Sequence, residues 1–266
     1  MFSFLRRWCQ PTDSANLEIP PEHWRRLEER LPALDFLTPI ELARLRTLAL
    51  AFLEEKEFSG GQDFQVTDDM RLSIALTACL PILNLGLDWY SDWVGIIVYP
   101  GDFVVPRRMV DAAGVLHEYD DVLAGQAWQG GPVVLSWLDE ATPGVNVMLH
   151  EFSHKLDMHG DGTANGLPPL PPDMSLHAWA NAFRHAFEDF RRRVRHAEFR
   201  GREMELDPYG AESPGEFFAV MSEAFFETPL LLKEQYPDVY EQFRLFYRQD
   251  PAPREEALIL SEGQPT

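Results

Sequence analysis

Apolar residues recur at helical spacing along the first ninety positions. Residues 20–31 open with two prolines, which suit a helix start, and continue with apolar residues at helical spacing, which predicts a first helix. A second helix is predicted for residues 40–56 after Thr38-Pro39, with its apolar positions 42, 45, 48, 49 and 52 on one side. Residues 68–83 read as a third, largely buried helix that ends near Pro81. This part of the chain is therefore expected to be mainly helical.

The pattern changes between residues 93 and 137. Residues 93–105 are rich in β-branched and aromatic side chains and predict a strand pair or a strand–turn–strand around Pro100-Gly101. Residues 133–137 (VVLSW) predict a short strand. Thr142 and Pro143 are then the expected N-cap and first residue of a helix, with apolar positions at 145, 148, 149, 152 and 156. Gly160 and Gly162 should end that helix.

The remaining third of the chain predicts helices again. Residues 176–198 form a long helix that ends in a basic run, RRRVRH at 191–196. We interpret this run as a solvated helix end that the macrodipole favours. Further helices are expected from Ser213-Pro214 to residue 226 and over residues 231–247. With no internal repeat, one α+β domain is the economical interpretation, and a separate helical N-terminal subdomain is the alternative.

Composition limits the classes of function. The chain has 266 residues, 45% of them hydrophobic, which is enough for a substantial core. Its formal net charge of −20 disfavours nucleic acid and anionic membranes as partners. The sequence has only two cysteines, Cys9 and Cys79, no signal peptide and no apolar stretch long enough for a membrane span. We therefore expect a cytoplasmic protein, with Cys79 in the core.

One short motif carries the clearest chemistry. In VNVMLHEFSHKLDMHGDG, residues 145–162, His150 and His154 stand four positions apart and share one face of the predicted helix. Two imidazoles so placed can hold a divalent metal ion, with Glu151 beside them as a base. This is the H-E-x-x-H pattern of zinc peptidases.

A catalytic zinc ion needs a third protein ligand and an open position for water. A continuation of the metzincin type would need glycine at position 157, where the sequence has Asp157. His159 and Asp161 follow the motif but lie where the helix ends. The alternative is a glutamate from a later helix.

Three downstream glutamates are candidates for that ligand. Glu216 opens a helix of buried-type residues, although a capping box with Ser213 would also explain it. Glu223 lies seven residues on, on the same face, and is either a rival ligand or a hydrogen-bond partner of a metal-bound histidine. Glu212 is a weaker rival. Asp157, three residues after His154, is a second candidate partner for a histidine.

Two further patterns resemble known families. Tyr209, followed seven residues later by Glu216 and then Phe217-Phe218, resembles the catalytic domain of anthrax lethal factor. Over residues 27–251 the chain resembles the Mlc titration factor A family of zinc metallopeptidases, through HEFSHKLDM, SPGEFFAVMSEAFF and FYRQDP.

The resemblance implies a fold and an activity. It implies an α+β, zincin-like metallopeptidase fold that is predominantly helical with a small mixed sheet. Residues 1–266 would form one domain, with a helical N-terminal part over about 20–90 and a catalytic part over about 91–250. The expected protein is a gluzincin-type, aminopeptidase-like enzyme that cleaves a peptide or protein and also binds the glucose-regulatory repressor Mlc.

The resemblance also assigns roles to individual residues. One Zn²⁺ per chain would be held by His150, His154 and Glu216. Glu151 would be the catalytic base, and Tyr209 would stabilise the oxyanion.

Two alternatives stay open at this point. The chain could be a non-catalytic interaction module that sequesters a transcriptional repressor, with zinc serving structure or regulation. The strand at 133–137 could pair with an extended substrate by β-augmentation, or it could be an ordinary core strand. The sequence contains no G-x-S-x-G, P-loop or dinucleotide-binding motif that would favour other chemistry.

Overall fold

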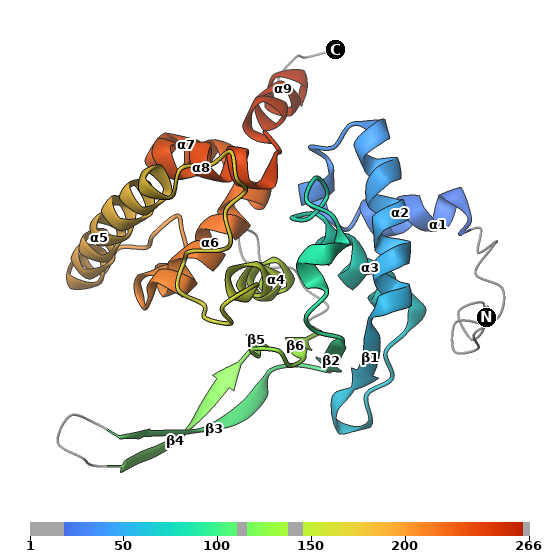
Figure 1. Cartoon of the computed structure of the whole chain (residues 1–266), viewed down its shortest axis with the longest axis horizontal. Helices are drawn as coiled ribbons and strands as arrows, with labels where there is room; N and C mark the ends of the chain where they lie inside the picture. Colours follow the sequence, from blue (N-terminus) through green and yellow to red (C-terminus); the bar gives the residue numbers. More distant parts are fainter. Residues whose placement is uncertain (1–18, 111–115, 138–145, 263–266) are drawn as a thin grey trace.

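The computed structural model describes residues 19–110, 116–137 and 146–262; for residues 103–123 and 261–262 the description covers the backbone. One helix, α4 (Val147–Met158), lies at the centre of the molecule (Figure 1). Helices α1 to α3 lie on one side of it and helices α5 to α8 on the other, and the sheet lies alongside a third side (Figure 1). The arrangement places the predicted metal-binding helix inside the fold.

The N-terminal helices begin at the positions that their capping residues dictate. They are α1 (Pro21–Glu28), α2 (Pro39–Glu55) and α3 (Asp68–Cys79). The Thr38 hydroxyl accepts a hydrogen bond from the backbone N–H of Glu41, whose carboxylate accepts in return from the Thr38 backbone N–H. This reciprocal capping box fixes the start of α2. The three predicted N-terminal helices are confirmed, and α3 ends four residues before the expected boundary.

The sheet is small and mixed. Its order is β1 (Glu57–Gly60), β2 (Gly95–Tyr99), β6 (Val133–Ser136) and β5 (Gly125–Ala127). The first three strands are parallel, and β5 runs antiparallel to β6. A separate antiparallel hairpin of β3 (Phe103–Val110) and β4 (Leu116–Leu123) extends away from the body (Figure 1). The predominantly helical α+β class with a small mixed sheet is confirmed.

Two strand predictions need correction. The strands predicted for residues 93–105 exist as β2 and β3, but they belong to different sheets and do not pair with each other. The predicted strand at 133–137 is β6, which pairs with β2 on one side and β5 on the other. Its backbone donors and acceptors are therefore already used, so the prediction that an extended substrate adds to β6 is wrong. Among the described strands, the outermost one on this side of the sheet is β5.

The C-terminal helices are α5 (Leu176–Arg200), α6 (Pro214–Glu227), α7 (Pro229–Gln235), α8 (Pro237–Tyr247) and α9 (Ala252–Glu262). The single helix predicted over residues 231–247 is wrong, because Tyr236 has non-helical backbone angles (φ −137°, ψ 66°) before Pro237 and separates α7 from α8. Four short 3₁₀ segments lie in the connections between helices and strands: η2 (Pro32–Leu34), η3 (Gly61–Asp63), η4 (Leu87–Tyr90) and η5 (Pro208–Ala211). No helix in the described ranges is long and apolar enough to cross a bilayer.

The start of α4 differs from the sequence prediction. Thr142, Pro143 and the apolar position 145 lie outside the described residues, and the helix begins at Val147. Its N-cap is Asn146, whose side-chain oxygen accepts a hydrogen bond from the backbone N–H of Leu149 at 3.0 Å. The cap therefore comes from a residue that also faces α6.

Buried hydrophobic residues from both helical parts form one cluster. On the N-terminal side Phe52, Tyr90, Trp93 and Phe152 pack edge to face or tilted, with ring centroids 5.4–6.1 Å apart. On the other side, aromatic residues of α5, α6 and α8 fill the core. Cys79 is fully buried, as expected. The single domain and its division near residue 90 stay predictions.

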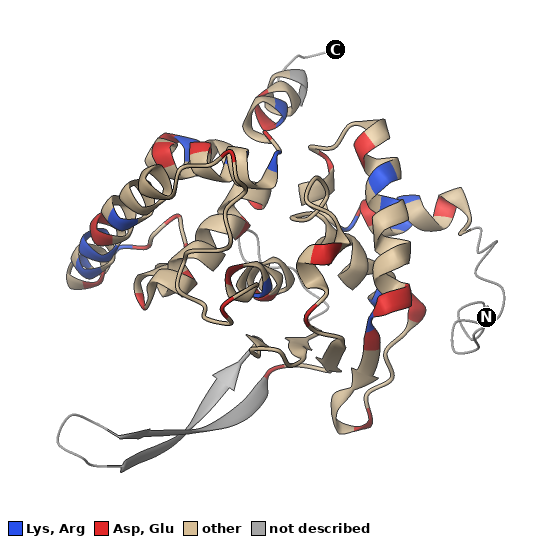
Figure 2. Ribbon diagram, in the orientation of Figure 1, with Lys and Arg blue, Asp and Glu red and all other residues tan. Residues whose placement is uncertain are grey.

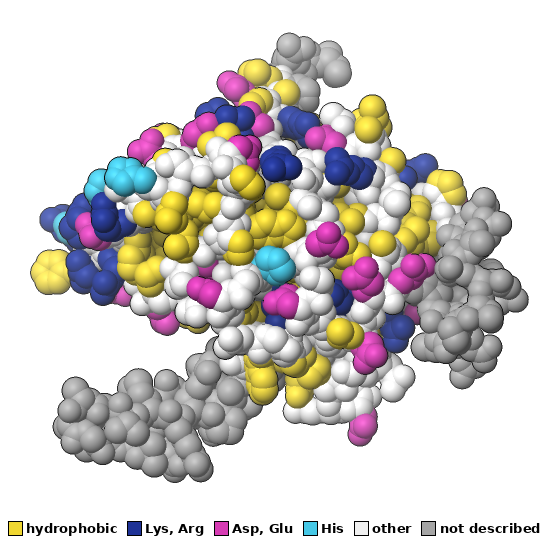
Figure 3. Space-filling model, in the orientation of Figure 1, with side chains coloured by type: hydrophobic (Ala, Val, Ile, Leu, Met, Phe, Trp, Pro, Cys, Tyr) yellow, Lys and Arg dark blue, Asp and Glu magenta, His cyan; other side chains and the backbone are white. Residues whose placement is uncertain are grey.

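Charged side chains are distributed unevenly over this core. Figure 2 shows Lys and Arg gathered at one end of α5, and Figure 3 shows the same basic end on the molecular surface. Elsewhere acidic and basic side chains are interspersed (Figure 2). The basic end is thus a local exception in a chain of net charge −20.

Candidate metal centre

Two histidines of α4 converge at one point. The imidazole rings of His150 and His154 lie 4.8 Å apart between centroids, and their Nε2 atoms are 3.1 Å apart. One helical turn separates them, so the backbone of α4 alone sets this spacing. Both side chains are largely buried, with 12% and 10% of their surface exposed.

The first turn of α6 brings a carboxylate to the same point. The Oε2 atom of Glu216 lies 2.9 Å from Nε2 of His150 and 3.1 Å from Nε2 of His154. Glu216 reaches this position because Ser213 caps α6, accepting a hydrogen bond from the Glu216 backbone N–H at 3.1 Å. The side chain does not complete a capping box and points at the histidines instead. Within the described residues, His150, His154 and Glu216 are the group whose spacing would suit a metal ion.

Glu223 orients one of the histidines. Its Oε1 accepts a hydrogen bond from Nδ1 of His150 at 2.7 Å, and its Oε2 accepts from the backbone N–H of Asn146 at 2.8 Å. With Nδ1 held as a donor to Glu223, loss of the Nε2 proton would leave the lone pair of that atom free to bind a cation at the point that His150 shares with Glu216. The amide of Asn146 in turn donates to Glu227 at 2.7 Å. Two glutamates of α6 therefore hold the start of α4.

The electrostatics of this cluster favour a positive charge. Burial disfavours an imidazolium, yet hydrogen bonds to Glu216 and Glu223 raise the pKa of His150 to about 10. Burial likewise opposes ionisation of Glu216, but hydrogen bonds from the two histidines lower its pKa to about 2. Two imidazole nitrogens and a carboxylate oxygen face one another, and this donor set fits a divalent cation of the zinc type.

Glu151 lies next to the cluster but faces the sheet. Only 6% of the residue is exposed, and its Oε2 atom has no hydrogen-bond partner among the described residues. A Cβ added at Gly125 in β5 would lie 2.5 Å from Oε1 of Glu151. Burial raises the pKa of Glu151 to about 7, so this carboxyl can exchange a proton near neutral pH.

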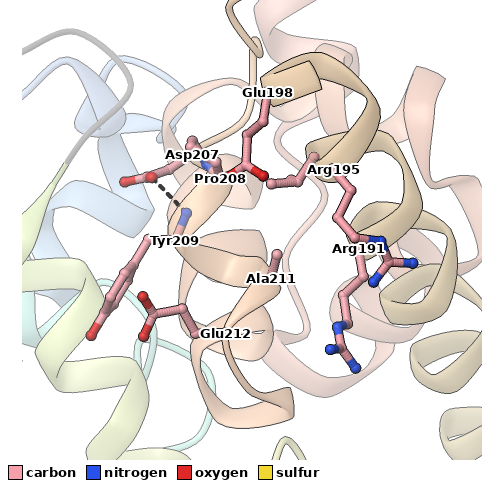
Figure 4. Close-up of a pocket in the computed structure, with 9 residues that line it drawn as sticks. Arg191, Arg195, Glu198, Asp207, Pro208, Tyr209, Ala211 and Glu212 are labelled. Atoms are coloured by element: carbon pink, nitrogen blue, oxygen red, sulfur yellow. Dashed lines mark hydrogen bonds between the residues drawn. The ribbon is translucent and has the colours of Figure 1, made fainter. Parts of the chain in front are cut away.

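Tyr209 stands beside His150 from a different element. It lies in η5, where its backbone N–H donates to the Asp207 carboxylate at 2.9 Å, and its ring centroid is 5.9 Å from that of His150. The side chain is 41% exposed, and its ring turns away from α5 (Figure 4). A phenol in this place is accessible to a ligand bound at the histidines.

Asp157 is close to His154 without a hydrogen bond between them. The carboxylate accepts from the backbone N–H of Gly166 at 2.7 Å, and burial raises its pKa to about 7. Among the described residues, Nδ1 of His154 and Oδ1 of Asp157 have no hydrogen-bond partner. The role of Asp157 beside a metal-bound histidine stays a prediction.

The rival ligands lie elsewhere. His159 contacts the ring of Trp89 at 5.2 Å between centroids, and Asp161 accepts a hydrogen bond from the backbone N–H of Thr163. Glu212 lines a cavity on the far side of Tyr209 (Figure 4). None of the three belongs to the His150 cluster found among the described residues.

Sequence reasoning missed two residues that shape this site. Lys155 is 2% exposed, and its ammonium group donates to the carbonyl of Trp128 and, at 2.7 Å, to that of Gly131. Both carbonyls belong to the turn between β5 and β6, so α4 fixes the position of β5. Gly125 lets that strand approach Glu151. A lysine inside an otherwise buried helical stretch was the available signal for the first, whereas Gly125 gave none.

Comparisons with known proteins bear on the whole chain. A family model described as glucose-regulated metallo-peptidase M90 matches residues 5–248. Among curated proteins, Mlc titration factor A of Klebsiella pneumoniae strain 342 is 35% identical over 252 residues, 93% of this chain and 92% of that protein. The protein of the same name from Edwardsiella ictaluri is 40% identical over 229 residues, 84% and 86% of the two chains. That from Pectobacterium atrosepticum is 37% identical over 238 residues, 88% of each. Both α4 and α6 lie within the matched range.

Proposed function

The chain belongs to the M90 family of glucose-regulated metallopeptidases, and from this premise we propose that it is a zinc-dependent peptidase of the gluzincin type. The proposed ligands are His150, His154 and Glu216. The observation that carries the proposal is the convergence of Nε2, Nε2 and Oε2 from α4 and α6 within 3.1 Å of one another. These three donors would hold a zinc ion and leave it an open position for water or substrate.

The residues around this position would divide the work of peptide hydrolysis. A bound zinc ion supplies a water molecule of lowered pKa and a Lewis acid for the peptide carbonyl. Glu151 would accept a proton from the attacking water and pass it to the leaving amine. The burial of this carboxyl, which raises its pKa, favours the uptake of that proton. The Tyr209 hydroxyl would donate a hydrogen bond to the oxyanion, a contribution of about 3 kcal/mol in comparable sites.

The position of β5 favours an extended peptide as the substrate of this site. The β5 strand is an edge strand, and Gly125 brings its backbone against Glu151. A peptide that paired with the outer edge of β5 would have its own backbone beside the proposed base. We propose β5 for this role in place of β6. Preference for the amino end of a peptide is proposed from the family resemblance.

A second function, protein binding, is supported by the relatives. They are named Mlc titration factor A, and we propose that this chain likewise binds Mlc or a similar repressor. A partner that acts on DNA implies a cytoplasmic site of action. The alternative in which this binding is the whole function, and the zinc serves structure or regulation, predicts a protein that holds metal but cleaves no peptide.

Metal analysis together with hydrolysis of an aminoacyl reporter tests the proposal. We expect one zinc per wild-type chain, and little or none in His150→Ala and Glu216→Ala. Glu151→Gln should keep the metal and lose hydrolysis while still binding the repressor. Full zinc occupancy in Glu216→Ala with loss in Glu223→Ala would contradict the ligand assignment. Metal binding without hydrolysis in wild type would favour the alternative.

A further inference from the structure

A cavity of about 480 Å³ lies between α5 and η5 (Figure 4). Tyr209 forms part of its lining. The ring of this tyrosine turns away from α5 and lies 5.9 Å from that of His150, so Tyr209 stands between the cavity and the proposed reaction centre (Figure 4). An extended ligand that passes Tyr209 would reach both.

One wall of the cavity carries two available positive charges. Arg191 and Arg195 stand four residues apart on α5 and therefore share one face. Within the described part of the chain neither guanidinium makes an ion pair, whereas Arg192 and Arg193 both pair with Asp189. The basic run at 191–196 is thus divided: part of it faces the cavity and part is neutralised on the outside.

Three acidic residues also line the cavity: Glu198, three residues after Arg195 on α5, and Asp207 and Glu212. The carboxylate of Asp207 already accepts the hydrogen bond from the Tyr209 backbone. In Figure 4 the carboxylates of Glu198, Asp207 and Glu212 point away from the two guanidinium groups, which lie near each other at the opposite wall. The guanidinium pair is therefore the positive part of a lining that also contains three carboxylates.

We propose that this cavity is a substrate subsite that receives an aspartate or glutamate side chain, which pairs with Arg191 and Arg195. The proposal rests on the proposed peptidase function and names its substrate class. With 43 acidic against 23 basic residues, most of the surface repels an acidic peptide, so a local pair of arginines decides where such a peptide can bind. Planar guanidinium groups also match a carboxylate in a bidentate geometry.

Matched peptide substrates test the subsite. Peptides that differ only by Glu, Gln or Lys at one position, scanned on both sides of the scissile bond, would be compared by kcat/KM. We expect one position at which Glu is preferred over Gln by about tenfold, chiefly through KM, as two such charge pairs allow. The double variant Arg191→Gln, Arg195→Gln should abolish the preference and leave the Gln peptide unaffected. Added salt should reduce the preference in wild type.

Arg200→Gln is the matched control, because it removes the same charge from α5 at a residue that does not line the cavity. It should keep the preference for Glu. Equal kcat/KM for the three peptides, or a preference for Lys set by the Glu198 and Glu212 side, would overturn the proposal.

A binding assay separates this proposal from the peptidase proposal. The labelled peptides can be titrated into Glu151→Gln and followed by fluorescence anisotropy. Tighter binding of the Glu peptide, lost in the double arginine variant, would support the subsite even if wild type hydrolysed nothing. Equal binding of Glu and Gln peptides would overturn it even if wild type hydrolysed both.

Discussion

The two sides of α4 are held in different ways. Toward α6 the contacts at the histidines join side chains to side chains, as His150 meets Glu216 and Glu223, and one further contact reaches the Asn146 backbone. Toward the sheet they join side chains to backbone, as Lys155 binds two carbonyls and Glu151 lies against Gly125. The contacts of α4 with α6 therefore depend on the identity of the side chains. Its contacts with the sheet depend on the position of the β5 backbone.

The largest effect should come from the sheet side. Lys155→Met would leave the carbonyls of Trp128 and Gly131 without their donor and should lower the free energy of unfolding by about 3 kcal/mol, since these hydrogen bonds come from a charged group. Denaturant unfolding measures this loss. Hydrolysis per folded molecule should also fall, because β5 would no longer be held.

Lys56→Met is the control for that variant. Lys56 is also buried, and its ammonium donates to the carbonyls of Tyr90 and Trp93, away from β5. It should destabilise the protein comparably and leave hydrolysis per folded molecule unchanged. An equal loss of hydrolysis in both variants would show that the loss comes from general destabilisation and not from the position of β5.

On the α6 side, Glu223→Gln should weaken zinc binding by about 10- to 100-fold, as substitutions of groups that orient metal-bound histidines do. The amide nitrogen of glutamine would face either the imidazole N–H of His150 or the backbone N–H of Asn146, both of them donors. Competition with a zinc-binding dye measures the affinity. Glu227→Gln, one turn along α6, contacts Asn146 but neither histidine and should retain the affinity.

A smaller steric change probes the gap between β5 and α4. In Gly125→Ala the new methyl group would lie 2.5 Å from the Glu151 carboxylate and 2.7 Å from Val147. We expect a loss of about 1 to 2 kcal/mol in stability, as overpacking causes, and a fall in kcat with zinc content unchanged. Gly101→Ala should keep both stability and kcat, because none of the described atoms lies within 4 Å of the added Cβ. Loss of zinc in Gly125→Ala would show that the two sides are coupled.

The smallest expected effect lies outside both sides of α4. Burial opposes ionisation of Glu41, but hydrogen bonds from Arg254 and Thr38 lower its pKa to about 2 from 4.5. Because the folded-state pKa is depressed, the stabilisation is complete above the ordinary pKa and is lost as the pH falls from about 4.5 through 2. The pair is partly exposed, so we expect about 1 kcal/mol.

Unfolding of wild type and Glu41→Gln across that pH range measures the effect. The difference between the two proteins should shrink toward acid pH. Zinc affinity and hydrolysis at neutral pH should match wild type in Glu41→Gln, which would confirm that the contacts of α4 act locally.

The helices and the two histidines could be predicted because their signals are local. Thr38-Pro39 and Ser213-Pro214 mark helix starts within a few residues, and the spacing of His150 and His154 follows from helix geometry. Apolar periodicity does not reveal the break at Tyr236-Pro237, because the apolar pattern continues from α7 into α8.

The sheet and the choice among glutamates depend on distant partners. The β5 strand is three residues long, contains no β-branched residue and exists through its pairing with β6. Glu216 and Glu223 share one face of α6, so their spacing alone cannot distinguish the residue at Nε2 of His150 from the one at Nδ1. That distinction needs the position of α6 against α4.

The three converging donors come from segments made at different times during synthesis. Positions 150 and 154 leave the ribosome more than sixty residues before position 216, and α5 lies between them in the chain. Because chains emerge from the N-terminus, a nascent molecule holds two imidazoles without their carboxylate until α6 has been translated and has packed. Truncated chains that end before α6 would therefore lack one of the three donors, which confines a complete ion site to molecules that carry most of the sequence.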